Sequence, residues 1–362
     1  MSIDRLKPVR EKLKKWENPV FLVSGRENIR FLSGFTGSSG QLLISSESAW
    51  LLSDFRYRTQ AAEELFPGIV FVEGPRFPDK LKELLSEIRP VNLLFESCHS
   101  SYADFQKLET VLRELDGVSI TLQGQEALVE QIRLSKSEEE LAFIKKAVKI
   151  AEEAFKEVFP LIRPGARESE IALSLEYEIK KRGGKPAFDT IVASGINGAK
   201  PHAGATYKKL VAGDLVVIDW GARYKGYCSD MSRTISLGRP AGKGKEIFQT
   251  VLSAQARAIK AVRPGIACAE VDGGARNYIK DRGYGEFFGH GTGHGVGLEI
   301  HEQPTVSSQS KTSLEQGMVF TVEPGIYLPD YGGVRIEDMV AVTAEGCQTL
   351  TSLPREIVVN IS

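Results

Sequence analysis

The chain contains 362 residues, of which 42% are hydrophobic and 26% are charged, and its formal net charge is -1. This length suggests two domains, and this composition is typical of a globular protein. The balanced charge argues against nucleic acid and anionic membranes as partners, and no apolar run reaches the ~18 residues of a membrane span. The N-terminus lacks the apolar region of a secretion signal. We therefore expect a cytoplasmic protein whose four cysteines, which form no CxxC pair, are reduced.

Residues 1–123 predict a small α/β domain, because short apolar runs alternate with helical patterns. This order favours a mixed or parallel sheet that is covered by helices. The expected helices cover residues 3–16, 57–65, 80–88 and 102–115. The expected strands are the runs PVFLV, QLLIS, AWLLS, IVFVE and NLLFE.

Three glycines, Gly34, Gly37 and Gly40, mark a tight loop in the segment SGFTGSSG. A phosphate-binding glycine loop leads directly into a helix. This loop leads into the strand-like run QLLIS, so we reject that interpretation of the glycine pattern.

The second domain is expected over residues 134–362, after a linker at 124–133. Ser137 followed by Glu140 is the signature of a capping box, and apolar residues then recur at helical spacing. A further helix is expected over residues 168–182, where two glycines end the pattern. The domain therefore begins with a pair of helices.

The second domain contains an internal repeat. The tripeptide Arg-Pro-Gly at 163–165 recurs at 263–265, and GDLVVID, which ends at Asp219, resembles GMVFTVE, which ends at Glu323. An apolar strand that ends in an acid needs a partner for it, because buried carboxylates are costly unless they are paired, hydrogen-bonded or bound to metal. Two such strands in equivalent positions predict a pseudo-twofold site at the domain centre.

The segment LVVIDWGARYKGYCSDMSRTISL predicts two strands joined by a turn at Lys225 and Gly226. In that register Asp219 and Asp230 are diagonal neighbours on one face of the hairpin. Such neighbours lie roughly 7–8 Å apart at Cα, so both side chains can reach a common ion. The alternative, that the acids only flank a turn, is weaker for two acids on one face than for one.

A second hairpin is expected in MVFTVEPGIYLPDYGGVRIEDMVAV. A turn centred on Tyr331 makes Glu323 and Glu337 diagonal neighbours on one face. Asp338 then points to the opposite face.

Three of the five histidines, His290, His294 and His301, fall in the glycine-rich stretch FGHGTGHGVGLEIHE. Its glycines argue against a helix, and so against a helical pair of zinc ligands, and His99 lies outside any such group. Two Asp, two Glu and one His form an oxygen-rich ligand set that suits Mn²⁺ best, with Co²⁺, Fe²⁺ or Zn²⁺ as alternatives. Four carboxylates balance the charge of two divalent ions, and paired ions of this kind catalyse hydrolysis.

In these motifs the second domain resembles the pita-bread metallopeptidases, which include aminopeptidase P, prolidase and methionine aminopeptidase. The match runs through FDTIVASGINGAKPHA, VVIDWGARYKGYCSDMSRT, GHGTGHGVGLEIHE, VFTVEPG and GGVRIEDMV. The first domain resembles the creatinase-like N-terminal domain, through NIRFLSGFTGSSGQLLIS and LLSDFRYRTQA. The resemblance implies an α/β (α+β) fold: a creatinase-like domain followed by a pita-bread catalytic domain with an internal pseudo-twofold repeat.

The resemblance also implies a set of metal ligands. Asp230 and Glu337 would bridge two metal ions, Asp219 would bind one of them, and His294 and Glu323 would bind the other. Glu323 would also act as the general base.

Other positions would handle the substrate, which the resemblance implies is a proline-containing peptide. His202, in KPHA, and His301, in EIHE, would bind it and stabilise the tetrahedral intermediate by oxyanion-type interactions. His290 would line the pocket, and Arg335 would contact acidic groups of the site or a substrate carboxylate.

Several relatives share these motifs. The glycine loop, which has no charged residue, favours a Xaa-Pro aminopeptidase over prolidase, a Xaa-Pro dipeptidase restricted to dipeptides. Methionine aminopeptidase generally lacks the N-terminal domain, and metal-free creatinase-like hydrolases or binding proteins have lost metal ligands. The resemblance further implies a homodimer or a higher homo-oligomer.

Overall fold

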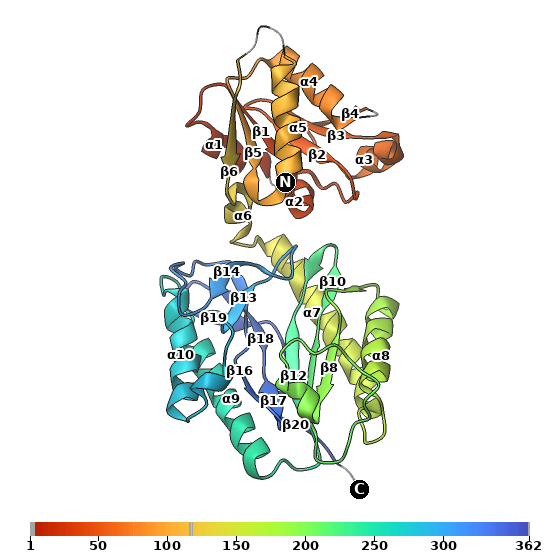
Figure 1. Cartoon of the computed structure of the whole chain (residues 1–362), viewed down its shortest axis with the longest axis vertical. Helices are drawn as coiled ribbons and strands as arrows, with labels where there is room; N and C mark the ends of the chain where they lie inside the picture. The colour runs from red at the N-terminus through yellow and green to blue at the C-terminus, as the bar shows by residue number, and fades with distance from the viewer. Residues whose placement is uncertain (1–3, 75, 116, 118, 361–362) are drawn as a thin grey trace. The chain divides into compact units, whose positions relative to one another are not determined.

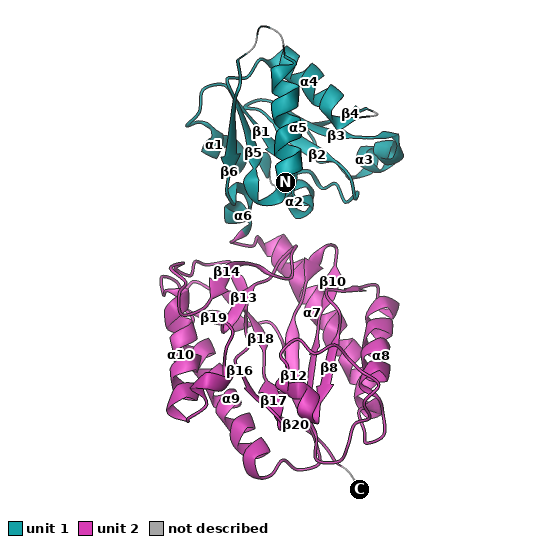
Figure 2. Ribbon diagram, in the orientation of Figure 1, with its two compact units in different colours: residues 1–133 teal, residues 134–362 magenta. Residues whose placement is uncertain are grey.

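The structure is a computed structural model of the chain and describes residues 4–74, 76–115, 117 and 119–360. The chain divides into two compact units, Met1–Arg133 and Leu134–Ser362, shown in teal and magenta in Figure 2. The start of the helix expected over 3–16 falls outside the described residues. In the part of the chain that is described, no helix is both long enough and apolar enough to cross a membrane.

Unit 1 is built on a mixed six-stranded sheet with the order β4-β3-β2-β1-β5-β6 (Figure 1). Only β2 runs against its neighbours, because β1 pairs with β5 in parallel and β3 pairs with β4 in parallel. This confirms the expected mixed sheet. The strands are β1 Pro19–Val23, β2 Gln41–Ile44, β3 Ala49–Ser53, β4 Ile69–Glu73, β5 Asn92–Glu96 and β6 Thr121–Gln125.

Helices cover both faces of this sheet. On one face Leu22, Leu43 and Leu52 pack with leucines of α4 and α5, which also contact each other (Figure 1). The alternate strand residues are buried as well, and α1 and α2 contact β1 and β2. The helices are α1 Leu6–Leu13, α2 Arg26–Ser33, α3 Arg58–Glu64, α4 Phe77–Ile88, α5 Tyr102–Arg113 and α6 Leu128–Arg133.

The segment expected to be a linker, residues 124–133, carries the end of β6 and the helix α6. Leu128 and Val129 of α6 are buried, and the helix contacts α1 and α2. These residues therefore belong to the core of unit 1, and the chain passes directly from α6 into unit 2.

Unit 2 consists of two similar halves. Each begins with a helix pair, α7 Glu138–Val158 with α8 Glu168–Lys181, and α9 Gly242–Ala261 with α10 Cys268–Asp281. The expected capping box is present, because the Ser137 hydroxyl accepts from Glu140 N–H while the Glu140 carboxylate accepts from Ser137 N–H.

The repeat is visible in the backbone. Arg167 forms an isolated antiparallel bridge with Lys209, and Ala267 forms the equivalent bridge with Ser313, in each case just before the second helix of the pair. The two helices that follow have the same length, 14 residues. This agreement confirms the internal repeat expected from the sequence.

The strands of unit 2 lie between the two helix pairs (Figure 2). They form sheets with the orders β20-β12-β9-β8, β14-β13-β15-β18-β19, β11-β10-β7 and β16-β17. The strands are β7 Lys185–Pro186, β8 Ile191–Ser194, β9 Leu215–Trp220, β10 Ala222–Tyr224, β11 Tyr227–Cys228, β12 Met231–Leu237, β13 Gly293–Gly295, β14 Glu302–Val306, β15 Val319–Val322, β16 Gly325–Leu328, β17 Gly332–Arg335, β18 Asp338–Val342, β19 Cys347–Thr349 and β20 Ile357–Val359. Short 3-10 helices cover Phe55–Tyr57, Ser97–His99, Phe159–Leu161, Gly195–Ala199 and Gly285–Phe287.

Candidate metal centre

The first hairpin of unit 2 has the register expected from the sequence. Asp219, on β9, pairs with Ser232 on β12, so Asp230 is its diagonal neighbour. Asp230 is 4% exposed, and Asp219 has a side-chain exposure of 14%. The hairpin therefore brings two acids to one largely buried face.

The second hairpin differs from the expected one. The pairs Val322 with Asp338 and Gly325 with Arg335 flank the acids, so Glu323 lies directly opposite Glu337 and not diagonally. The turn is centred on Asp330, which adopts a left-handed conformation with φ of 62°. An Asp side chain tolerates this conformation better than the tyrosine we expected at the centre.

Asp338 points away from Glu337, as expected. Its carboxylate accepts hydrogen bonds from Arg233 at 2.8 Å and from Gln255 at 2.7 Å, and its side chain is 2% exposed. It is thus a paired structural acid on the other side of the strand.

His294 reaches the acids from β13. The flanking glycines are required, because a Cβ on Gly293 would lie 1.8 Å from Thr321 O and a Cβ on Gly295 would lie 2.1 Å from Gln303 O. The His294 Nε2 atom lies 3.3 Å from Glu323 Oε1 and 3.6 Å from Asp230 Oδ2.

These side chains converge on one point. One ligand atom each from Asp230, His294 and Glu337 lies within 4.8 Å of the others, and Glu323 is in reach of His294. The structure therefore groups four of the five ligands implied by the resemblance, and the fifth, Asp219, is the diagonal neighbour of Asp230.

The carboxylates of this group are incompletely paired. Within the described part of the chain, the buried atoms Asp219 Oδ1, Asp230 Oδ1 and Glu337 Oε1 accept no hydrogen bond. Burial and the neighbouring acids raise the pKa of Asp230 and of Glu337 well above their ordinary values, and burial also raises the pKa of Glu323. A buried carboxylate oxygen without a hydrogen-bond donor can be stabilised by a bound cation, so these residues fit divalent metal ions.

Arg335 is hydrogen-bonded to residues of the metal centre. Its Nη2 donates to Asp219 Oδ2 at 2.7 Å, and its Nε donates at 2.8 Å to the Ser232 hydroxyl, which donates to Glu337 Oε2 at 2.9 Å. Burial would lower the pKa of Arg335, but Tyr327, Asp219 and Glu323 hold it well above its usual range. The guanidinium therefore stays charged and fixes the orientation of two ligands.

The remaining histidines, His301, His290 and His202, differ in their contacts with neighbouring residues. The His301 ring packs edge-on against His294, with centroids 4.3 Å apart, and His290 Nε2 lies 3.0 Å from the Tyr327 hydroxyl. Burial lowers the pKa of all three of these histidines. His202 is exposed and makes no hydrogen bond to the described residues, but its charge contributes to the lowered pKa of His301.

Sequence reasoning did not single out Ser232, Thr321 or Tyr327. Thr321 donates to Glu323 Oε1 at 3.3 Å, and Tyr327 accepts from Arg335 Nη1 at 3.0 Å. Ser232 and Thr321 each lie two residues from a ligand, so the period of a strand places them on the same face. That periodicity could have identified them.

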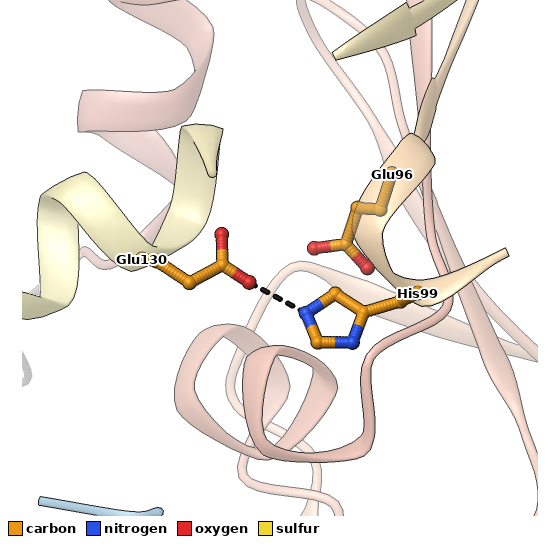
Figure 3. Close-up of side chains that lie close together, drawn as sticks. All are labelled: Glu96, His99 and Glu130. Atoms are coloured by element: carbon orange, nitrogen blue, oxygen red, sulfur yellow. Dashed lines mark hydrogen bonds and ion pairs between the residues drawn. The ribbon is translucent and has the colours of Figure 1, made fainter. Parts of the chain in front are cut away.

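Unit 1 holds a second group of possible ligands: Glu96, His99 and Glu130 (Figure 3). His99 Nε2 lies 2.6 Å from Glu130 Oε1. Glu96 Oε2 accepts from the N–H groups of Ser24 and Gly25, each at 2.7 Å. We call these three side chains the unit 1 cluster.

Asn28 links the two acids of the unit 1 cluster. Its amide nitrogen donates to Glu96 Oε1 and to Glu130 Oε1, each at 2.6 Å, and its oxygen accepts from Arg133 at 2.6 Å. Burial raises the pKa of Glu96, while hydrogen bonds from His99 and Asn28 overcome burial and lower the pKa of Glu130 to about 2. Both oxygens of Glu96 and the Oε1 atom of Glu130 therefore already have hydrogen-bond partners within the protein.

Comparison with known families covers both units. A family model described as "Metallopeptidase family M24" matches residues 142–344, and one described as "Creatinase/Prolidase N-terminal domain" matches residues 5–135. These matches confirm the expected combination of a creatinase-like domain and a pita-bread catalytic domain.

Individual relatives span the full chain. A Xaa-Pro dipeptidase from Pyrococcus horikoshii is 39% identical and covers 98% of this chain and 99% of its own length. The solved structure of a Xaa-Pro dipeptidase from Bacillus anthracis matches with a TM-score of 0.94 and 38% identity, over 99% of this chain and 100% of that one. The structure of an X-Pro aminopeptidase from Thermotoga maritima matches with a TM-score of 0.88 and 40% identity, over 97% and 100% of the two chains.

Proposed function

This chain belongs to metallopeptidase family M24, and we propose that it hydrolyses Xaa-Pro dipeptides with the help of two divalent metal ions. The observation that carries the proposal is the group of buried acids beside His294, in which three carboxylate oxygens have no hydrogen-bond donor among the residues that the structure describes. A charge-balanced pair of divalent ions would satisfy these oxygens. Asp219, Asp230, His294, Glu323 and Glu337 would hold the ions.

Metal ions bound there would polarise the scissile carbonyl and lower the pKa of a water molecule. The chain supplies the remaining functions. We assign proton acceptance to Glu323 Oε1, which accepts a hydrogen bond from the Thr321 hydroxyl at 3.3 Å and lies 3.3 Å from His294 Nε2. Arg335 keeps Asp219 oriented through their contact at 2.7 Å.

The histidines around the centre would handle the substrate. His301, against the His294 ring, and the exposed His202 would bind the substrate and stabilise the tetrahedral oxyanion. His290 would form part of the pocket wall, beside Tyr327. A prolyl amide has no N–H to offer, so recognition must come from groups that accept its ring and carbonyl.

The comparisons favour a dipeptidase over the aminopeptidase that the glycine loop suggested. The relative from P. horikoshii and the structure from B. anthracis are both named Xaa-Pro dipeptidase, although the T. maritima structure is named X-Pro aminopeptidase.

A direct assay separates these activities. Purified protein with Mn²⁺ should cleave a Xaa-Pro dipeptide rapidly and the matched Xaa-Pro-Xaa tripeptide slowly, and a chelator should stop both reactions. Equal or faster cleavage of the tripeptide would make the enzyme an aminopeptidase. Cleavage of neither substrate would contradict the proposed function.

We also propose Mn²⁺ as the activating ion, because carboxylate oxygens dominate the ligand set. Metal-free protein that is reconstituted with Mn²⁺, Co²⁺, Fe²⁺ or Zn²⁺ in parallel should be most active with Mn²⁺. Higher activity with Zn²⁺ would contradict this choice and leave the reaction unchanged.

A further inference from the structure

Unit 1 contains a cavity of about 660 Å³ whose lining includes none of the metal-centre residues. This volume falls within the range of about 300–1,000 Å³ that small-molecule sites occupy. Its lining comes entirely from unit 1, between Leu22 and Val111. The cavity is therefore a property of the N-terminal unit by itself.

The cavity lies where α/β sheets commonly bind ligands. Ser24 follows β1, Asp54 follows β3, Gly74 follows β4, and Ser100 follows the 3-10 helix after β5. These strands run in one direction, so their carboxyl ends share one edge of the sheet. Open α/β sheets bind small molecules outside this edge.

Charged side chains of both signs line the cavity. Four cations line it, Arg26, Arg76, Lys80 and Lys107, against two acids, Asp54 and Asp104. Arg76, Lys80 and Lys107 have acidic partners on their own helices. Arg26 is exposed and makes no hydrogen bond or ion pair with any residue the structure describes, so it is available to an anion.

Two helices begin at the cavity wall. Residues at the start of α2 and α4, Arg26 and Phe77, belong to the lining, and neither helix has a side-chain cap. The N-terminus of a helix carries a partial positive charge and free N–H groups. At α2 the Glu96 carboxylate already accepts from the N–H of Gly25, and Pro78 of α4 has no N–H, so the helix ends offer only the remaining N–H groups of their first turns.

The rest of the lining contains both polar and apolar side chains. Hydroxyls come from Ser24, Ser38, Ser39, Ser53 and Ser100, while Leu22, Leu52, Val72 and Leu108 form an apolar wall. Gln41 also lines the cavity, and no residue that the structure describes donates a hydrogen bond to its buried Oε1. An occupant would therefore need an anionic group, an apolar or ring-shaped body and a donor for Gln41.

We propose that this cavity binds a small organic phosphate, with the phosphate beside Arg26 and the body of the molecule against the apolar wall. Phosphate suits the site better than a carboxylate, because it offers more oxygens to hydroxyls, cations and helix N-termini. The glycine loop at 34–40 contributes part of the lining but opens no helix, so we assign the phosphate contact to Arg26 at the start of α2.

Binding can be tested on the metal-loaded enzyme by calorimetry. The probes are adenosine monophosphate, glucose 6-phosphate, pyridoxal phosphate and inorganic phosphate, with adenosine and N-acetylleucine as compounds that lack phosphate. At least one organic phosphate should bind with a Kd below about 1 mM. Arg26→Gln should weaken that binding about tenfold or more, because a charge-assisted contact is lost.

The variants separate this cavity from the metal centre, which also attracts phosphate. Arg239→Gln is the matched control, since Arg239 is an exposed arginine of unit 2 that makes no hydrogen bond to the described residues. Arg239→Gln should bind like the wild type, Arg26→Lys should retain part of the affinity, and all variants should cleave dipeptide at the wild-type rate.

Three results would overturn the proposal. The first is equal affinity in the wild type and Arg26→Gln, which would place the phosphate elsewhere. The second is the absence of saturable binding by every phosphate probe. The third is binding of N-acetylleucine as tight as that of the phosphates and equally dependent on Arg26, which would make the ligand a carboxylate.

Discussion

The metal centre and the unit 1 cluster contain the same kinds of side chains but differ in how their oxygens are satisfied. In the unit 1 cluster both oxygens of Glu96 accept hydrogen bonds, and Glu130 Oε1 accepts from Asn28 and His99. In the metal centre Asp230 Oδ1 and Glu337 Oε1 are buried and accept no hydrogen bond from the described part of the chain.

This difference separates a structural cluster from a binding site. Both sets bring acids and a histidine within 4.8 Å, so proximity alone does not distinguish them. Unsatisfied buried oxygens do, because leaving them without a partner has a large free-energy cost that a cation can offset. We therefore expect metal in unit 2 and a hydrogen-bonded clamp, without metal, in unit 1.

Metal removal should have the largest effect. Dialysis against a chelator should abolish dipeptide cleavage and lower the midpoint of thermal unfolding, because the acids of unit 2 then repel one another. Metal analysis of the reconstituted enzyme should find two ions per chain. Full activity in protein shown to be metal-free would refute the assignment.

Glu323→Gln should have the second-largest effect. The amide cannot accept the proton, so kcat should fall by about 10²–10⁴-fold while the fold persists. Glu345→Gln, which alters an exposed glutamate of unit 2, is the matched control and should have wild-type kcat. A variant at Glu323 that keeps near wild-type turnover would remove it from the mechanism.

Glu130→Gln should change stability and leave catalysis intact. Folding lowers the pKa of Glu130 from 4.5 to about 2, so its ionised form stabilises the native state above pH 4.5 and loses this effect as the pH falls towards 2. The variant should be less stable by about 2–3 kcal/mol at pH 7, and the difference should shrink below pH 4.5. Urea unfolding of both proteins at pH 7 and pH 4 measures this trend, and a difference that is constant or larger at pH 4 would contradict it.

His99→Gln should have the smallest effect. It removes the imidazole beside Glu130 and should cost about 1–2 kcal/mol in urea unfolding. Metal content and kcat should match those of the wild type. A loss of one bound ion per chain would show that the unit 1 cluster is itself a metal site.

Local patterns predicted many elements correctly. The five apolar runs of unit 1 are strands, and α7 begins with the capping box expected at Ser137. The sequence did not indicate β6, because TLQGQ is a largely exposed edge strand that depends on pairing with β5. It also did not indicate α2 and α6, which are short helices held by tertiary contacts.

The candidate site was partly predictable for a related reason. The register of the hairpin that carries Asp219 and Asp230 follows from the alternation of its residues. The second hairpin shifted because Asp330 takes the left-handed position at the turn. Residue spacing alone does not determine this register, because the register depends on the backbone conformation of Asp330.

The sequence by itself determined the two α/β units, the internal repeat and the identity of the grouped acids, because strand periodicity and motif order are local properties of the chain. Only the tertiary structure decided which buried oxygens lack donors, since that depends on residues far apart in sequence. Arg335 reaches Asp219 and, through Ser232, Glu337, while Asn28 satisfies both acids of the unit 1 cluster. The same residue types thus form a metal centre in one unit and a clamp in the other, because different donors surround them.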